Sequence, residues 1–136
     1  MLLTYSVKPS FVEDIKNGIK IHTIREDNTD RWKAGRSIHH WWGNPRNPRN
    51  NPYCFLENRC VSTQKIWIYR FEFTDPKKGF ALHLAIEIDD IPIDWTRIEI
   101  LVQNDGLTME EFFNYFTPQP NTTFEGKIIH WTDLRY

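Results

Sequence analysis

The strongest β-strand pattern in the chain is Cys60-Val61-Ser62-Thr63-Gln64-Lys65-Ile66-Trp67-Ile68-Tyr69-Arg70-Phe71-Glu72-Phe73. β-Branched and aromatic residues are frequent in it, and such residues fit the pleated surface of a sheet. The turn-forming residues 75–79, Asp-Pro-Lys-Lys-Gly, follow, and residues 80–88 return as a second long β-rich stretch. The two stretches predict a long β-hairpin, which makes the fold mainly β.

Shorter elements are expected on both sides of this hairpin. Strands are predicted over residues 2–7, 19–24, 37–42, 93–102 and 127–131. Short helices are predicted after Ser10 and after Thr108, because a glutamate follows each of them three positions later, the pattern of a capping box. The expected fold class is therefore mainly β with short α-helices (α+β), arranged as a small barrel with peripheral helices in a single domain, residues 1–136.

The composition agrees with one packed domain. Of the 136 residues, 40% are hydrophobic and 15% aromatic, which is enough apolar surface for one core. No run approaches the roughly 18–20 apolar residues of a membrane-spanning helix, and residues 1–10 lack the pattern of a signal peptide. Cys54 and Cys60 are too few for a disulfide framework. We therefore expect a cytoplasmic protein with no membrane partner, while its oligomeric state stays open.

The charges are unevenly distributed although the net charge is only −1. Residues 16–60 contain nine Lys or Arg and four Asp or Glu, a net +5, whereas residues 83–136 contain three and ten, a net −7. If the basic stretch gathers on one face, it can attract a phosphate backbone. Alternatively, the two stretches face each other and largely cancel.

The residues best suited to chemistry lie in segment 18–25, Gly-Ile-Lys-Ile-His-Thr-Ile-Arg. Burial lowers the pKa of a lysine, and a neutral Lys20 amine could take the proton of the Thr23 hydroxyl to make a nucleophile. Arg25 offers a planar fork for a carbonyl, carboxylate or phosphate. The alternative is an ordinary edge strand with solvated charges. Positions 20 and 23 of a regular strand point to opposite faces, so the pair needs a bend or bulge to share one pocket.

Asp105 lies in the turn Asn104-Asp105-Gly106, just before the second predicted helix. Its carboxylate could serve in proton transfer, and the positive end of the helix dipole would favour its ionised form. The alternative is a turn residue whose side chain binds the local backbone.

Four further residues are of types that bind zinc: His39, His40, Cys54 and Cys60. Their spacing matches no common zinc pattern, because there is no C-x-x-C pair and no second histidine pair. We therefore expect no metal site, and we expect Cys60 in or near the core.

Segment 43–52 contains three prolines and repeats Asn-Pro-Arg, so it is expected to be a long surface loop. Trp41 and Trp42 precede it, and strand alternation places one of the two in the core. The other tryptophan could stack on a base while the loop arginines hold phosphates. Trp42, Arg46 and Arg49 are thus candidate ligand-binding residues, together with His22 and Arg25 of segment 18–25.

Two motifs of this chain resemble those of the ASCH domains, members of the PUA-like superfamily. The first is Gly18-x-Lys20-x-x-Thr23-Ile24-Arg25 after the helical stretch 11–17, followed by Lys33-Ala34-Gly35. The second is Asn104-Asp105-Gly106-Leu107 followed by Glu110-Glu111-Phe112, which is similar to the family's acidic turn and helix. Segment 43–59 has no counterpart. The resemblance implies a small β-barrel with peripheral helices and a cleft beside the helix-to-strand turn.

Some ASCH members hydrolyse the acyl amide of 4-N-acylated cytidine with a lysine, a threonine and an acidic residue. The resemblance places these roles on Lys20, Thr23 and Asp105, although those hydrolases carry glutamate at the last position. The implied function is an amidohydrolase of N-acylated cytidine-type nucleosides without metal or other cofactor. Thr23 would be the nucleophile and Lys20 its base, Asp105 would help protonate the departing amine, and Arg25 would hold the substrate or stabilise developing negative charge.

Other ASCH and PUA-like domains bind RNA, and some have been linked to RNA cleavage or to coactivator assemblies. A non-catalytic module for RNA or a modified nucleotide is therefore the alternative, with Arg25 and the residues at the 43–52 loop as contacts. A metal-independent ribonuclease is a further possibility, in which His22 would act together with Lys20 and Arg25.

Overall fold

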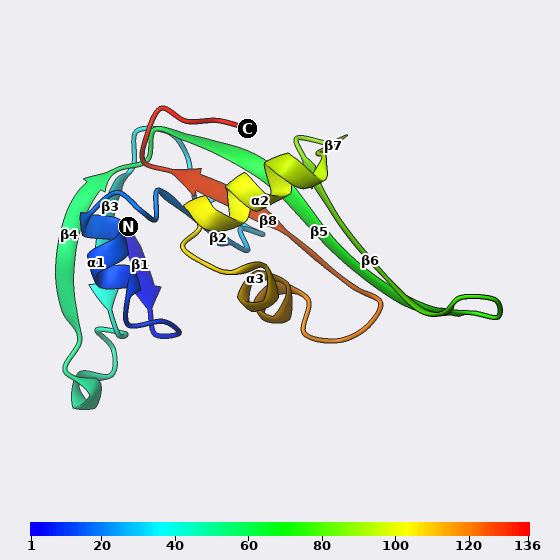
Figure 1. Ribbon diagram of the computed structural model, residues 1–136. Coiled ribbons are helices and arrows are strands. Elements are labelled where there is room, and N and C mark those ends of the chain that lie inside the picture. The colour runs from blue at the N-terminus through cyan, green and yellow to red at the C-terminus, as the bar shows by residue number, and fades with distance from the viewer.

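The computed structural model describes all residues, 1–136, and has two β-sheets and three α-helices (Figure 1). The smaller sheet has the order β1-β3-β4, with bounds Leu2–Tyr5, Ser37–Trp42 and Tyr53–Arg59. The larger sheet has the order β2-β8-β5-β6-β7, with bounds His22–Arg25, Thr122–His130, Ser62–Asp75, Gly79–Ile88 and Ile91–Pro92. The helices are α1 (Phe11–Lys16), α2 (Trp95–Asn104) and α3 (Met109–Phe116), and a 3-10 turn, Pro48–Asn50, lies in the proline-rich loop.

The predicted long hairpin is confirmed. Strands β5 and β6 pair antiparallel from Ile66↔Ile88 to Asp75↔Gly79. On the other side of β5, β8 pairs antiparallel from Ser62↔His130 to Arg70↔Thr122. The far end of the hairpin extends well beyond the rest of the molecule (Figure 1).

The structure shows no closed form of the expected small barrel, because the two sheets share no continuous hydrogen-bonded ladder. Strand β1 pairs only with β3, and β2 pairs only with β8. The chain crosses between the sheets at a corner after β4, where the Cys60 N–H donates to Arg36 and the Val61 N–H donates to His130. Strands β1 and β2 do not pair with each other, and a closed barrel would need hydrogen bonds across that gap. The α+β class, mainly β, is confirmed.

The predicted strand over 93–102 is also wrong, because this segment forms helix α2. The Asp94 side chain accepts a hydrogen bond from the Arg97 N–H and caps the helix. Ile98, Leu101 and Val102 are its buried residues, at the i, i+3, i+4 spacing of one helical face. The cap and this spacing outweigh the β-branched composition of the segment.

The other two helices occur where they were predicted. Thr108 and Glu111 form the complete capping box at α3. At α1, by contrast, Ser10 makes no side-chain cap hydrogen bond, so only the second of the two predicted boxes is present.

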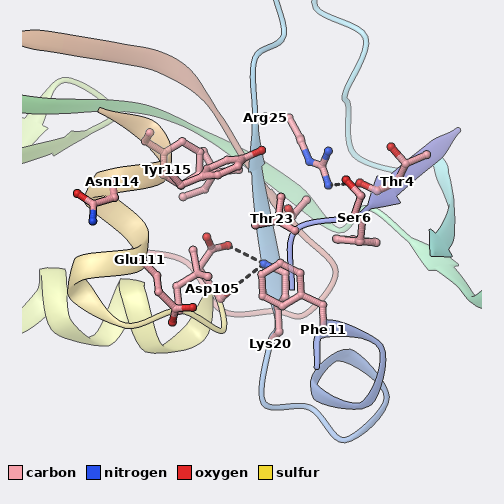
Figure 2. A pocket seen from close by; sticks show the side chains of 15 residues that line it. Thr4, Ser6, Phe11, Lys20, Thr23, Arg25, Asp105, Glu111, Asn114 and Tyr115 are labelled. Carbon is pink, nitrogen blue, oxygen red and sulfur yellow. Dashed lines mark hydrogen bonds and ion pairs between the residues drawn. The ribbon is translucent and has the colours of Figure 1, made fainter. Parts of the chain in front are cut away.

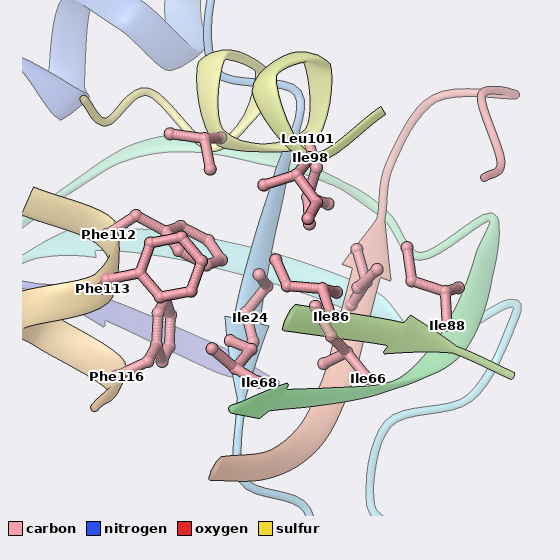
Figure 3. Close-up of a cluster of buried hydrophobic side chains, with 12 residues drawn as sticks. Ile24, Ile66, Ile68, Ile86, Ile88, Ile98, Leu101, Phe112, Phe113 and Phe116 are labelled. Atoms are coloured by element: carbon pink, nitrogen blue, oxygen red, sulfur yellow. The ribbon is translucent and has the colours of Figure 1, made fainter. Parts of the chain in front are cut away.

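Helices α2 and α3 pack on one face of the larger sheet and enclose the main core (Figure 3). Its fully buried members include Ile66, Ile68, Leu101, Phe112 and Ile128. A second core lies under the smaller sheet and α1, and it contains Cys60, as the sequence predicted. Burying a side chain of this size contributes about 1.5–3 kcal/mol, so the two cores fix the positions of the segments around the site. None of the helices could cross a lipid bilayer, given their length and polarity.

Candidate functional site

A cavity of about 410 Å³ lies between β1 and β2, which do not pair with each other, and α3 forms its other wall (Figure 2). This volume falls in the range of about 300–1,000 Å³ typical of small-molecule sites. Polar groups from distant parts of the sequence meet there. The polar lining residues include Thr4, Ser6, Lys20, Thr23, Arg25, Asp105, Glu111 and Asn114.

Lys20 and Thr23 line the same cavity because Lys20 precedes the strand. The Ile19 and Lys20 N–H groups both donate to the Asp14 carbonyl, which closes a turn after α1. Strand β2 begins only at His22, so the alternation of side chains that would separate positions 20 and 23 does not apply. The bend that the pair requires is therefore present.

Lys20 and Asp105 form a buried ion pair beside the cavity. The Lys20 ammonium donates to the Asp105 carboxylate at 2.9 Å and to its backbone carbonyl at 2.7 Å. The two side chains are only 2% and 3% exposed. The Lys20 Nζ also lies 4.6 Å from the centre of the Phe11 ring. An ammonium has three donors, so one remains for a group in the cavity.

The two pKa values of this pair are shifted for different reasons. Burial lowers the pKa of Lys20, although the Asp105 carboxylate opposes that change. Burial by itself would raise the pKa of Asp105, but the Lys20 charge and the His22 hydrogen bond hold that pKa below its usual value. Asp105 is the C-cap residue of α2 and does not cap the N-terminus of a helix. Its ionised form is therefore stabilised by Lys20 and His22 and not by a helix dipole. Lys20 thus gives up its proton more readily than a solvated lysine.

His22 lies behind the ion pair and does not line the cavity. Its Nδ1 is 3.2 Å from the Asp105 carboxylate, and its Nε2 is 2.6 Å from the Tyr136 hydroxyl. Because Asp105 is ionised, the His22 Nδ1–H donates to it, and the Nε2 atom accepts a hydrogen bond from the Tyr136 hydroxyl. The Tyr136 oxygen accepts in turn from the Asn104 side chain at 3.0 Å. Burial lowers the pKa of His22 and keeps the ring neutral. We therefore assign His22 to positioning Asp105.

Arg25 lies at the open edge of β2 and faces β1. Its Nη2 donates to the Thr4 carbonyl at 2.8 Å, and the guanidinium carbon is 5.2 Å from the centre of the Tyr5 ring. These contacts hold the guanidinium at the wall of the cavity, where its other N–H groups can bind an oxygen of a ligand (Figure 2).

Gly106 allows the chain to pass close to Lys20. Its φ is +77°, and a Cβ atom there would lie 3.2 Å from the Lys20 Cβ and 3.3 Å from the Phe11 ring. Glycine is the residue that adopts this backbone conformation without strain and leaves this space free.

The structure does not bring Trp42, Arg46 and Arg49 to the cavity. Trp42 is half-buried and packs against the second core, while the two arginines are exposed on the proline-rich loop. The basic stretch that contains them is also partly neutralised by the acidic one, since Lys20 pairs with Asp105.

Several lining residues were not predicted from the sequence. Glu111, Asn114 and Tyr115 face the cavity from α3 at i, i+3 and i+4, and this spacing was visible as the polar side of an amphipathic helix. Thr4 and Ser6 come from the end of β1 and its following turn, where no pattern in the sequence distinguished them. The same holds for Tyr136, which reaches His22 across 114 positions of the chain.

No family model, curated protein or solved structure matches this chain. What the site can do is therefore inferred from its geometry. It combines a hydroxyl, a lysine whose pKa is lowered, a buried carboxylate and a guanidinium around one cavity. Those are the groups needed for nucleophilic attack on a carbonyl with proton transfer.

Proposed function

We propose that the chain is an ASCH-type, PUA-like amidohydrolase that removes the acyl group from N-acylated cytidine-type nucleosides. The observation that supports this most is the meeting of Lys20, Thr23 and Asp105 at one cavity, with Lys20 bonded to Asp105. The two free cysteines support a reducing compartment, and we place the protein in the cytoplasm. The proposed chemistry uses side chains alone.

In the first half-reaction the Thr23 oxygen attacks the acyl carbonyl carbon. A neutral Lys20 amine accepts the hydroxyl proton, and Arg25 donates to the oxygen that becomes negatively charged. The carbon–nitrogen bond then breaks, and the departing exocyclic amine of the base takes a proton from the Lys20 ammonium. Asp105 keeps Lys20 in place and stabilises its charged form between the two transfers. The products of this step are free cytidine and an acyl ester on Thr23.

In the second half-reaction water attacks the ester carbonyl and Lys20 accepts one water proton. The carbon–oxygen bond to Thr23 breaks, and the threonine oxygen recovers a proton from Lys20. The acid is released and loses its proton to solvent, so the net reaction consumes one water and yields cytidine, a carboxylate and one proton. The buried Asp105–His22–Tyr136 chain lets Asp105 hold one orientation through both steps.

The alternative is that the same cavity binds a modified nucleotide or an RNA end without turnover. Arg25 and the aromatic Tyr115 would then supply the contacts from opposite walls. The loop residues Arg46 and Arg49 lie outside the cavity, so they do not extend the site into a binding surface for a longer RNA. His22 is fully buried with both ring nitrogens engaged, so the geometry lends no support to a ribonuclease that uses it.

The test is release of acetate from 4-N-acetylcytidine by the purified chain at low and high salt. Hydrolysis of this neutral substrate is expected to vary little with salt, whereas RNA binding would weaken steeply. Lys20→Met is expected to lower the rate by about 10²-fold or more, because it removes the general base. Lys16→Met, a change at an exposed lysine, is the control. If the folded wild type binds labelled RNA but releases no acetate, the hydrolase proposal is wrong and the binding module is favoured.

A further inference from the structure

A second group of chemically reactive side chains lies on the smaller sheet, away from the cavity. His39 on β3 and Cys54 and Glu57 on β4 each offer one ligand atom, and these atoms all lie within 4.8 Å of one another. His39 Nδ1 and a Glu57 carboxylate oxygen are 3.6 Å apart. None of the three residues lines the cavity.

A β-bulge creates this group. His39 and Glu57 are direct cross-strand partners, but the register shifts between His40 and Trp41, so that Trp41 pairs with Cys54. Phe55 is thus the extra residue on β4. In a regular strand positions 54 and 57 would face opposite sides, whereas one extra residue returns them to the same side, the side of His39. Bulges often re-aim side chains in this way.

The three side chains are accessible to solvent and offer three different ligand atoms. The His39 and Glu57 side chains are 41% and 67% exposed, and Cys54 is a half-buried free thiol. An imidazole nitrogen, a thiolate sulfur and a carboxylate oxygen are the three ligand types of Zn²⁺ in proteins. Mg²⁺ and Ca²⁺ prefer oxygen ligands, so the sulfur favours a borderline transition metal.

We propose that His39, Cys54 and Glu57 bind one divalent ion of the zinc class, with the fourth tetrahedral position left to water. Binding forms a metal–sulfur bond in place of the Cys54 S–H bond, and the thiol proton leaves to solvent. His39 binds through the lone pair of a neutral ring nitrogen, and Glu57 through its carboxylate. The ion cross-links β3 to β4 at the base of the proline-rich loop. This site is independent of the proposed hydrolysis.

The spacing in the sequence, His39 followed by Cys54 and then Glu57, matches no common zinc motif. The ligands come from two strands joined by a long loop, and two of them share a face only because of the bulge. For these two reasons no metal site was expected from the sequence, although the fold brings three possible ligands together.

The probe is Co²⁺ titrated into the full, metal-free chain under reducing conditions, followed by competition with Zn²⁺. Binding at one equivalent is expected to produce a thiolate-to-cobalt charge-transfer band and the strong visible bands of tetrahedral Co²⁺, and Zn²⁺ should abolish both. Cys54→Ser should remove the charge-transfer band. His39→Ala and Glu57→Gln should each weaken binding by more than the ~10–100-fold that loss of an outer-shell partner costs. Cys60→Ala, at the other thiol, and His83→Ala, at a histidine on β6, should leave the spectrum unchanged.

A metal bound at this site should also raise the midpoint of thermal unfolding of the wild type but not of Cys54→Ser. Absence of the charge-transfer band in the folded wild type would overturn the proposal. So would a band that persists in Cys54→Ser or is lost in Cys60→Ala. Binding that is equally strong in His39→Ala and Glu57→Gln would show a lone-thiol contact and overturn it as well.

Discussion

Replacing Asp105 by asparagine tests the buried ion pair, because the change removes a charge and almost no volume. Lys20 would keep its hydrogen bond to the backbone carbonyl of residue 105 but lose its counter-charge. A lysine so buried must then either stay charged without a partner or give up its proton. Holding it neutral at pH 7 against the ordinary pKa of 10.5 costs about 5 kcal/mol, at roughly 1.4 kcal/mol per pH unit. Loss of one partner of a buried ion pair typically costs about 3–5 kcal/mol, which agrees.

Urea denaturation of wild type and Asp105→Asn measures this difference, and we expect about 3–5 kcal/mol less free energy of unfolding at pH 7. Burial lowers the folded-state pKa of Lys20 and the Asp105 charge opposes that change, so loss of this charge lowers the pKa further in the variant. The folded variant then binds fewer protons than the folded wild type, and its stability rises more steeply with pH. The deficit should therefore narrow from pH 7 to pH 9. The double variant Lys20→Met/Asp105→Asn removes the stranded charge and should recover much of the loss. A deficit below about 1 kcal/mol, or no recovery in the double variant, would refute the reasoning.

Three further outcomes follow from the same region. Gly106→Ala forces a Cβ into a left-handed position against Lys20 and should cost about 1–2 kcal/mol in urea denaturation; an unchanged midpoint would contradict the close approach. Tyr136→Phe leaves a buried ring nitrogen of His22 without its donor and should cost about 1–3 kcal/mol, whereas Tyr53→Phe, at an exposed tyrosine, should cost little. The buried histidines with lowered pKa values are His22, His40 and His130. Two of those pKa values are about 4, so the contribution of these histidines to stability should be complete above pH 6.5 and be lost as pH drops toward 4; no loss of stability over this range would contradict neutral burial.

The hairpin and the α3 capping box were predictable because their determinants are local. Runs of β-branched and aromatic residues on both sides of a turn specify β5 and β6, and a threonine and a glutamate three positions apart specify the start of α3. The strand prediction for segment 93–102 failed because it relied on the β-branched residues of that segment. The Asp94 cap and the helical spacing of three buried apolar residues stabilise a helix instead. The open seam between β1 and β2 depends on which strands pair, and no local pattern specifies pairing between distant segments.

The site was partly predictable for the same reason. Lys20, Thr23 and Arg25 are close in sequence, so their chemistry could be recognised there, and the break of the strand before His22 brings Lys20 to the same cavity. Asp105 was predicted as an acid, but its pairing with Lys20 joins residues 85 positions apart. Nothing in the sequence indicated that Tyr136 would close the hydrogen-bond chain.

The proposed hydrolysis depends most on Thr23 as the nucleophile, and the most direct test compares two substitutions at that position. Thr23→Val keeps the shape but has no hydroxyl, whereas Thr23→Ser keeps the hydroxyl. The measurement is the rate of acetate release from 4-N-acetylcytidine, with urea denaturation confirming that both variants fold. We expect Thr23→Val to lose activity by about 10⁴-fold or more and Thr23→Ser to retain a measurable fraction. A Thr23→Val protein that still hydrolyses the substrate near the wild-type rate would contradict the role of Thr23 as the nucleophile.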